Sequence, residues 1–514
     1  MVEAFPWWTE ENKQLAKELD TFVLNHYEEA ERHYFMKKFP HGILNEIKEL
    51  GYFGAGVPKK YGGLELGATG ACIVAEQLGR LYCVGHCFTV SMLGGLHQLL
   101  EFGTDEQKEY WLTKIAKGQL GAVCITEPFA GSDAANVYTT GVKDSDEWVI
   151  NGKKRFITNA GTGHRYLMYI KTSDDPKDRA AYKHLSTFVF ERGTKGFSLE
   201  KINDLIGFDN VPNGYLNMKD VRLPESAMVG NPGQGWEIMM SGLNFERMIG
   251  SAGVGGSLLD AARLLHFHSQ RRVQFGKPLK FIENVSFTLA RLIARLKYAR
   301  LMSFYTAYLL DLGKQPIIES SIAKWFNVDW AMQSGIETVQ AMGGDALTRF
   351  YPVERMVREA KIGQLVAGTN EVMAYLVYRV ATGMAMTKEL ETPFRFKMDD
   401  EAGYPVATLD KGPYVDEEAT PELVLKILAE DYRVNPSLYM MIDDIKKQCK
   451  GSRKKIREVC KELVNDGLAV AYYDRDGEIK MVKANYKGLD KANPPEYYRW
   501  FPQWYDVERD AFSG

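Results

Sequence analysis

The sequence has little of what marks a membrane, secreted or polyanion-binding protein. Its 64 lysines and arginines nearly balance its 67 aspartates and glutamates, so the formal net charge of −3 gives no general attraction to nucleic acid or anionic membranes. No apolar run approaches the roughly 18 to 20 residues of a membrane-spanning helix. The stretch "MVEAFPWWTEENKQ" lacks the basic flank and apolar core of a signal peptide.

Cysteine is also scarce, with six residues among 514. This number indicates reduced thiols rather than a disulfide framework, and we expect a cytoplasmic location. Cys83, His86 and Cys87 lie close together, but no second ligand cluster accompanies them. Buried thiols on a helix are therefore the favoured interpretation, and no metal site is expected.

Common nucleotide and metal motifs are missing too. The chain has no P-loop, no GxGxxG sequence after a predicted strand and no HExxH. We therefore do not expect a Rossmann or P-loop enzyme.

What the sequence does show is a change in the spacing of apolar residues along the chain. Helical spacing, as in "ENKQLAKELDTFVLNHYEEAERHYF", gives way to strand-like runs such as "WVINGKKRFIT" and "STFVFER", and long helical patterns then return. This order predicts a multidomain α+β protein. We expect an N-terminal helical domain over residues 1–118, a small antiparallel β domain over 119–233, a C-terminal helical bundle over 234–388, a linker over 389–418 and a further domain over 419–514.

The last region has its own pattern. Three short helical patterns precede two strand candidates, "LAVAYYD" and "EIKMVKAN", which are joined by the turn "RDG". Three helices and a β-hairpin resemble a winged helix-turn-helix domain. Basic residues gather over its second and third helices, so DNA binding is one hypothesis. Because the whole region is slightly acidic, an interaction, oligomerisation or lid role is favoured, and the aromatic-rich tail over 493–514 is a candidate to pack back onto this unit.

Four stretches carry a family resemblance: "GYFGAGVPKKYGGLEL", "CITEPFAGSD", "RRVQFGKPL" and "QAMGGDALTRFYPVERMVREAKIGQLVAGTNEVM". In order and spacing they resemble the signatures of the acyl-CoA dehydrogenase family of flavoproteins. The resemblance covers about residues 10 to 385. It implies a helical, β and four-helix-bundle architecture with FAD between the β domain and the C-terminal helices. It also implies a homo-oligomer, typically a tetramer, that passes electrons to electron-transferring flavoprotein.

The resemblance also implies ligand-binding positions. Those implied to bind FAD are Ile125, Thr126, Ser132, Phe156, Ile157, Thr158, Arg272, Gln274, Phe275, Gln340, Gly344, Thr369 and Glu371. Of these, Arg272, Gln274 and Phe275 match residues that clasp the diphosphate and adenine, whereas Gln340 and Gly344 match positions that approach from a neighbouring subunit. Those implied to bind the acyl-CoA substrate are Ser132, Asn244, Arg247 and Gly368.

The catalytic base is where the sequence departs from many family members. A base for this reaction is a buried carboxylate, whose pKa desolvation raises toward the working pH. Many members have a glutamate before the Gly-Thr turn, but Ala367 stands there in "VAGTNEV". In the isovaleryl-CoA and long-chain branches the base lies on a long helix, in a sequence similar to "GLNFER", and Glu246 matches it. The alternative is a structural ion pair between Glu246 and Arg247.

The expected function follows from the resemblance. It is FAD-dependent α,β-dehydrogenation of an acyl-CoA thioester, in which Glu246 removes the α-proton and hydride passes from Cβ to flavin N5, close to Thr158. The backbone N–H of Ala367 is implied to donate to the thioester carbonyl. Two alternatives stay open: an enoyl-CoA reductase that runs the reaction backwards, and a non-enzymatic DNA-binding or stress-response protein on the same fold. Branched, cyclic and long acyl groups all remain candidates.

Overall fold

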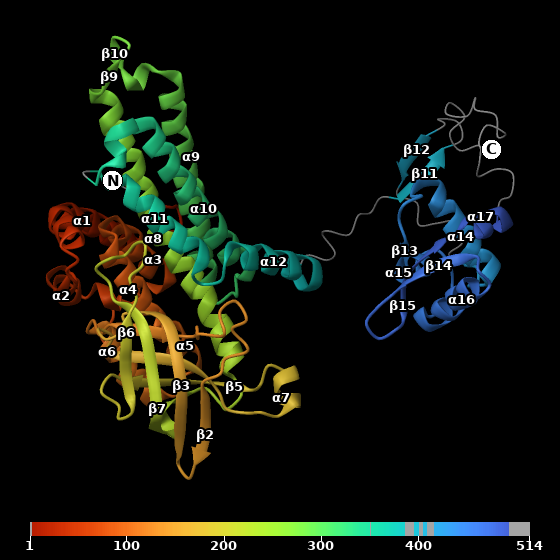
Figure 1. The fold of residues 1–514 in the computed structure, drawn as a ribbon, viewed down its shortest axis with the longest axis horizontal. Coiled ribbons are helices and arrows are strands. Elements are labelled where there is room, and N and C mark those ends of the chain that lie inside the picture. Colours follow the sequence, from red (N-terminus) through yellow and green to blue (C-terminus); the bar gives the residue numbers. More distant parts are fainter. Residues whose placement is uncertain (1–2, 350, 386–394, 400–403, 409–415, 493–514) are drawn as a thin grey trace. The chain divides into compact units, whose positions relative to one another are not determined.

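The computed structural model describes residues 3–349, 351–385, 395–399, 404–408 and 416–492. The chain divides into two compact units after Ala385. Figure 1 shows the helices and strands of both units. None of the helices within the described ranges combines the length and the apolarity that crossing a bilayer requires.

The first unit begins with helices that bury one face each. Thr9 caps the first helix by accepting a hydrogen bond from the backbone N–H of Asn12, and Leu15, Leu19 and Phe22 repeat at helical spacing along its buried face. Each fully buried side chain of this kind contributes about 1.5–3 kcal/mol. The helices are α1 (Glu10–Phe35), α2 (His41–Glu49), α3 (Gly67–Leu78), α4 (Cys83–Leu93), α5 (Leu96–Phe102) and α6 (Asp105–Ala116).

A sheet follows, with the strand order β6-β7-β3-β2-β4-β5-β8 and β1 beside β4. Most neighbours are antiparallel, as expected, but β1 and β2 each pair with β4 in parallel. The sheet contains β1 (Gly121–Cys124), β2 (Thr140–Asp144), β3 (Glu147–Thr158), β4 (Arg165–Lys171), β5 (Leu185–Glu191), β6 (Phe197–Ile202), β7 (Asn213–Pro224) and β8 (Met228–Val229), with the short helix α7 (Pro176–Ala180) after β4.

Long helices complete the first unit, and in Figure 1 the first three run side by side. They are α8 (Gly235–Arg271), α9 (Glu283–Asp311), α10 (Ile317–Met342), α11 (Val353–Leu365) and α12 (Asn370–Val380), and the hairpin of β9 (Val273–Gln274) and β10 (Lys277–Pro278) joins α8 to α9. Glycine lets α8 approach α3 closely. A Cβ on Gly256 would lie 2.1 Å from the carbonyl oxygen of Glu76, so no larger residue fits there.

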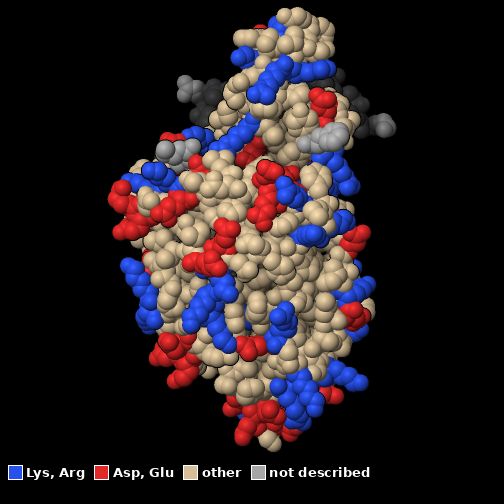
Figure 2. Space-filling view, turned by 90° about the vertical axis from the view of Figure 1, so that its left-hand side faces the viewer, with Lys and Arg blue, Asp and Glu red and all other residues tan. Residues whose placement is uncertain are grey.

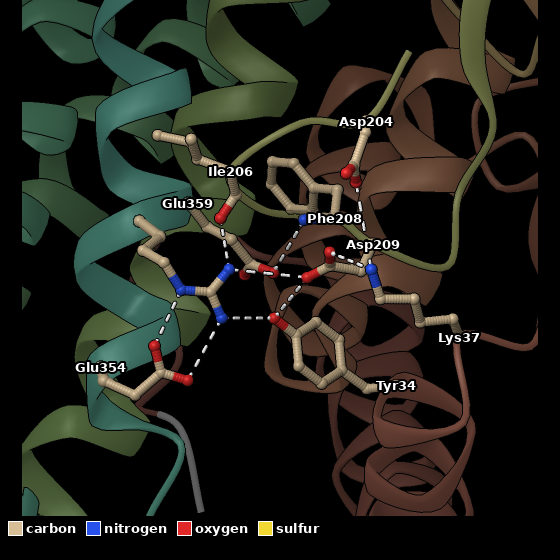
Figure 3. A network of polar contacts seen from close by, with 9 residues as sticks. Tyr34, Lys37, Asp204, Ile206, Phe208, Asp209, Glu354 and Glu359 are labelled. Atoms are coloured by element: carbon tan, nitrogen blue, oxygen red, sulfur yellow. Dashed lines mark hydrogen bonds and ion pairs between the residues drawn. The ribbon is translucent and has the colours of Figure 1, made fainter. Parts of the chain in front are cut away.

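The segment between β6 and β7 is held by polar contacts from two helices (Figure 3). Arg358 of α11 donates to the carbonyl oxygen of Ile206 and to the hydroxyl of Tyr34 on α1, and Tyr34 in turn donates to Asp209 over 2.9 Å. Glu359 accepts a hydrogen bond of 3.3 Å from the backbone N–H of Phe208, which has a left-handed φ of 55°. The helices thereby hold the backbone of this segment at Phe208.

The second unit has a separate apolar core. Its elements are β11 (Arg395–Asp399), β12 (Tyr404–Thr408), α14 (Pro421–Val434), β13 (Met440–Met441), α15 (Ile442–Lys446), α16 (Arg453–Asn465), β14 (Ala469–Tyr473), β15 (Ile479–Ala484) and α17 (Tyr486–Ala492). A three-stranded sheet of order β13-β15-β14 accompanies α14, α15 and α16, and this arrangement resembles a winged helix. The predicted three helices and hairpin are confirmed. The strands β11 and β12 lie where the sequence predicts a linker, and the tail over 493–514 lies outside the described residues.

Three of the five basic side chains of α16 lie close to acidic side chains of this unit. Arg453 makes two hydrogen bonds to the carboxylate of Asp443. Lys461 and Arg457 lie 3.3 and 3.9 Å from Glu478, at the end of the β14–β15 turn. Charge is mixed elsewhere too, since Figure 2 shows lysine and arginine interspersed with aspartate and glutamate over the face that it presents.

Candidate active site

A cavity of about 1510 Å³ lies inside the first unit, between the sheet and the helices α4, α8, α10, α11 and α12. It is larger than the roughly 300–1,000 Å³ of an ordinary small-molecule pocket, so it has room for two groups side by side. Many residues singled out from the sequence line it. They are Ile125, Thr126, Ser132, Phe156, Ile157, Thr158, Glu246, Arg247, Ala367, Gly368 and Thr369.

One wall comes from the end of β3. Phe156 has a φ of 58°, and the register of β3 against β7 shifts between Lys154 and Ile157. This irregularity breaks the alternation of a strand, so that three consecutive residues face the cavity. Asn213 holds the segment by donating to the carbonyl oxygen of Phe156 over 3.0 Å and to the Thr158 hydroxyl over 3.1 Å.

A buried ion pair supports the next wall. The Lys154 ammonium donates to Glu127 over 2.7 Å and to the carbonyl oxygen of Ile125 over 3.2 Å. Glu127 also accepts from the backbone N–H groups of Tyr138 and Thr139. Both charged side chains are almost fully buried. The pair therefore fixes the backbone beside Thr126 from behind the cavity.

Glu246 projects into the cavity from α8. The side chain is partly accessible, and it is accessible from this cavity. Among the described residues its carboxylate has no hydrogen bond or ion pair. Burial raises its pKa to about 7, although the charges of Arg247 and Lys324 act in the opposite direction. The Arg247 side chain is directed toward the turn at Ala367, since its Nε lies 3.4 Å from the carbonyl oxygen of that residue. The geometry does not support a structural Glu246–Arg247 ion pair, since adjacent helical residues diverge by about 100°.

The turn opposite Glu246 contains two consecutive left-handed residues, Ala367 with a φ of 56° and Gly368 with a φ of 90°. Lys324 of α10, which also lines the cavity, anchors this turn. Its ammonium donates to the carbonyl oxygen of Gly368 over 2.7 Å and to the Asn370 side chain over 2.9 Å. The backbone N–H of Ala367 has no acceptor in the described part of the chain and is free to meet a ligand.

His86 is a cavity residue for which the sequence suggests no role. Its ring stacks on Phe208 with a centroid distance of 4.0 Å, and its Nε2 lies 3.4 Å from the Thr158 hydroxyl. Burial lowers its pKa to about 4, so the imidazole is neutral near pH 7. Lys324 is the other missed residue. A lone lysine within the apolar helical pattern "SSIAKWFNV" was the available signal.

Three implied FAD positions, Arg272, Gln274 and Phe275, lie outside the cavity, on and beside the β9–β10 hairpin. All are exposed, Phe275 by 93%. The hairpin follows the far end of α8 (Figure 1). About 25 helical residues separate Glu246 from it, or roughly 38 Å at 1.5 Å per residue. Gln340 and Gly344 are likewise exposed and away from this cavity. Within one chain these five residues therefore do not contact the cavity that most of the other implied FAD positions line.

Asn244 and Glu371 are also absent from the cavity wall. Asn244 is buried and its side-chain oxygen accepts from Ser320 on α10. It precedes Glu246 by two helical positions, so the two side chains point about 200° apart, and the substrate contact implied for Asn244 stays a prediction. Glu371 is exposed at the start of α12.

The small residues of α8 divide between two roles. Gly250 and Gly253 line the cavity, and a Cβ on Gly250 would meet nothing within 4 Å. Gly256 is instead required for close packing against α3. The cavity is therefore widened along only part of the helix.

Comparison with known proteins identifies a family with this architecture. Family models match three successive ranges: the acyl-CoA dehydrogenase N-terminal domain over residues 9–119, the middle domain over 122–221 and the C-terminal domain over 233–382. An acyl-CoA dehydrogenase of Bacillus subtilis is 31% identical over 352 residues, which are 67% of this chain and 91% of that protein. An acryloyl-CoA reductase (NADH) of Anaerotignum propionicum is 32% identical over 349 residues, 66% of this chain and 86% of that protein.

A solved structure agrees with the sequence comparisons. Butyryl-CoA dehydrogenase from Megasphaera elsdenii superposes with a TM-score of 0.70 at 30% identity, and the match covers 74% of this chain and 99% of that one. The second unit lies beyond the ranges that the family models match. The chain therefore belongs to the acyl-CoA dehydrogenase family of FAD-dependent oxidoreductases.

Proposed function

We propose that this chain oxidises an acyl-CoA thioester between its α and β carbons, with Glu246 as the base. The observation that carries the proposal is the unpaired, cavity-facing carboxylate of Glu246, whose pKa of about 7 suits proton removal near neutral pH. Ala367 offers no side chain for this task, so the base comes from α8 rather than from the turn.

The chain's own groups account for the remaining needs of the reaction. The free N–H of Ala367 donates to the thioester carbonyl oxygen, where negative charge develops as the α-proton leaves. Arg247 and Lys324 hold the carbonyl oxygens of Ala367 and Gly368 and so keep that N–H in place. FAD, when bound along Phe156–Thr158, supplies the hydride acceptor. The wide cavity and the irregular end of β3 fit a flavin ring beside an acyl group.

A second copy of the chain completes the proposed site. The exposed Arg272, Gln274 and Phe275 cannot reach their own cavity, but they suit the diphosphate and adenine of FAD in a neighbouring subunit. Large apolar side chains on α9, among them Phe287 and Tyr298, are 58% and 61% exposed, which supports a homo-oligomer, proposed as a tetramer. Electron-transferring flavoprotein is the proposed electron acceptor, and the cytoplasm is the proposed location.

The direct test is anaerobic mixing of the flavin-loaded protein with straight, branched and cyclic acyl-CoAs while the absorbance of oxidised flavin is followed. At least one acyl-CoA is expected to bleach the wild-type protein but not Glu246→Gln. The matched control is Glu237→Gln, an exposed glutamate on the same helix, which is expected to behave as wild type. Bleaching of Glu246→Gln at the wild-type rate would remove Glu246 from the mechanism.

A second candidate is the reverse reaction, because a relative with 32% identity is an acryloyl-CoA reductase. The same residues serve both directions, since Glu246 would then deliver the α-proton. Anaerobically reduced protein mixed with enoyl-CoAs distinguishes the two. Faster reoxidation by an enoyl-CoA than reduction by the matching acyl-CoA would favour the reductase.

A further inference from the structure

A patch of two cations and two aromatic rings lies beside the cavity, on β3, β6 and β7. The guanidinium of Arg155 lies 4.2 Å from the ring centre of Phe156 and 5.4 Å from that of Tyr215. The Lys201 ammonium lies 4.5 Å from the same Tyr215 ring, and Lys201 pairs with Tyr215 in the strand register. Two positive charges thus converge on one aromatic side chain.

Neither cation has an acidic partner among the described residues. The Nε of Arg155 is buried and makes no hydrogen bond, although a buried charged donor without an acceptor is unfavourable. The nearby Lys153 shows the ordinary arrangement, because it pairs with Glu200 over 2.7 Å. Two positive charges near one ring, without an acidic partner, make this patch electropositive. An anionic group of a ligand would be attracted to it.

The patch is continuous with the cavity wall. Arg155 directly precedes Phe156, Ile157 and Thr158, which line the cavity, and its backbone N–H donates to the carbonyl oxygen of Thr126 over 2.8 Å. Phe156 has the cavity on one side and the guanidinium against its ring. A ligand that lies along Phe156–Thr158 would therefore have the Arg155 guanidinium close to it.

We propose that Arg155, with Lys201 beside it, binds a phosphate group of the ligand that occupies the cavity. The planar guanidinium offers a fork of donors that matches phosphate oxygens, and the rings of Phe156 and Tyr215 hold its plane in position. This inference rests on the proposed function, in which FAD and acyl-CoA both carry phosphates. In this inference Arg155 contacts a charged group of the ligand, whereas Phe156 and Ile157 contact its ring system.

The first test measures flavin affinity without turnover. Flavin-free protein is titrated with FAD, FMN and riboflavin, and binding is followed by flavin fluorescence. Arg155→Met is expected to weaken FAD binding about tenfold to a hundredfold, the usual effect of losing a charged hydrogen bond, and to leave riboflavin binding unchanged. Arg155→Lys is expected to recover part of the loss. Arg222→Met is the matched control, because Arg222 lies exposed on the same sheet and pairs with Asp144 and Glu147.

The second test identifies the source of the phosphate. Binding of an acyl-CoA and of the corresponding acyl-pantetheine, which has no phosphate, is measured by calorimetry on wild-type and Arg155→Met protein. A loss restricted to acyl-CoA, with FAD affinity unchanged, places the phosphate of CoA at Arg155. Equal losses for FAD and riboflavin, or no loss for any ligand, would overturn the proposal. Failure of the proposed function has another signature: wild-type protein that binds FAD but is not reduced by any acyl-CoA.

Discussion

The ammonium of Lys324 donates a 2.7 Å hydrogen bond to the carbonyl oxygen of Gly368, and so ties α10 to the turn that faces Glu246. The same ammonium also reaches the carbonyl oxygen of Gln364 and the side chain of Asn370. Three acceptors from one segment thus share a single buried cation. The turn needs this support because Ala367 is a non-glycine residue in the left-handed region.

Replacing Lys324 by Met is therefore expected to lower kcat/KM about tenfold or more. The buried acceptors lose their donor, which costs about 1–3 kcal/mol, and the N–H of Ala367 loses its fixed direction. The measurement is the rate of flavin reduction by a good acyl-CoA, together with the thermal midpoint. Lys361→Met is the control, since Lys361 is exposed on α11 and bonds only to a side chain in the same helix. Equal rates for both variants would contradict the role assigned to Lys324.

Breaking the Lys154–Glu127 pair is expected to weaken FAD binding and to destabilise the first unit. Lys154→Met leaves a buried carboxylate without its cation, and loss of one partner of a buried pair typically costs about 3–5 kcal/mol. The double variant Lys154→Met with Glu127→Gln removes both charges and is expected to regain part of that loss. FAD titration and urea unfolding of the three proteins give the comparison. A double variant no better than Lys154→Met would show that the pair acts through something other than charge balance.

Glu246 is expected to make folding stability depend on pH. Its pKa is raised from 4.5 to about 7 in the folded protein, so the folded state binds the proton more tightly than the unfolded state. The free energy of unfolding therefore falls as pH rises from about 4.5 through 7, by up to about 3 kcal/mol, since one pKa unit corresponds to about 1.4 kcal/mol. Urea unfolding of flavin-free protein at pH 5 and pH 8 should show a larger loss in the wild type than in Glu246→Gln, since the raised pKa values of Asp260 and Glu359 act equally in both. Parallel behaviour of the two proteins would refute it.

The winged-helix unit is expected to bind duplex DNA only weakly. Arg453 is paired with Asp443, and Arg457 and Lys461 lie beside Glu478, so three of the five basic side chains of α16 have acidic side chains close by. Fluorescence anisotropy with a labelled duplex at 50 and 200 mM salt measures this. The double variant Asp443→Asn with Glu478→Gln should bind more tightly and with a steeper salt dependence. Tight, salt-sensitive binding by the wild type would contradict this prediction and support the DNA-binding hypothesis.

Much of the architecture could be predicted from the sequence because the signals are local. The helical period of α1, the strand runs of β3 to β5 and the hairpin turn of the second unit each depend on neighbouring residues. The strands β2, β6 and β7 carry weaker patterns, since their polar residues face solvent and obscure the alternation.

The site was less accessible to sequence reasoning because its contacts are distant in the chain. Glu246 and Ala367 were found by motif, but the support from Lys324 spans 44 residues and the contact of His86 with Thr158 spans 72. Asn244 shows the converse case. It stands inside a recognised motif, yet its position on the helix directs it toward Ser320 and away from the cavity.

The most direct test of the account is the anaerobic rate of flavin bleaching by one active acyl-CoA, measured from pH 6 to pH 9 for the wild type and Glu246→Gln. If Glu246 is the base, the wild-type rate rises with pH through about 7, as the carboxyl loses its proton, and the variant stays at least about a thousandfold slower throughout. A variant that bleaches at the wild-type rate, with the same pH dependence, would show that another group removes the proton.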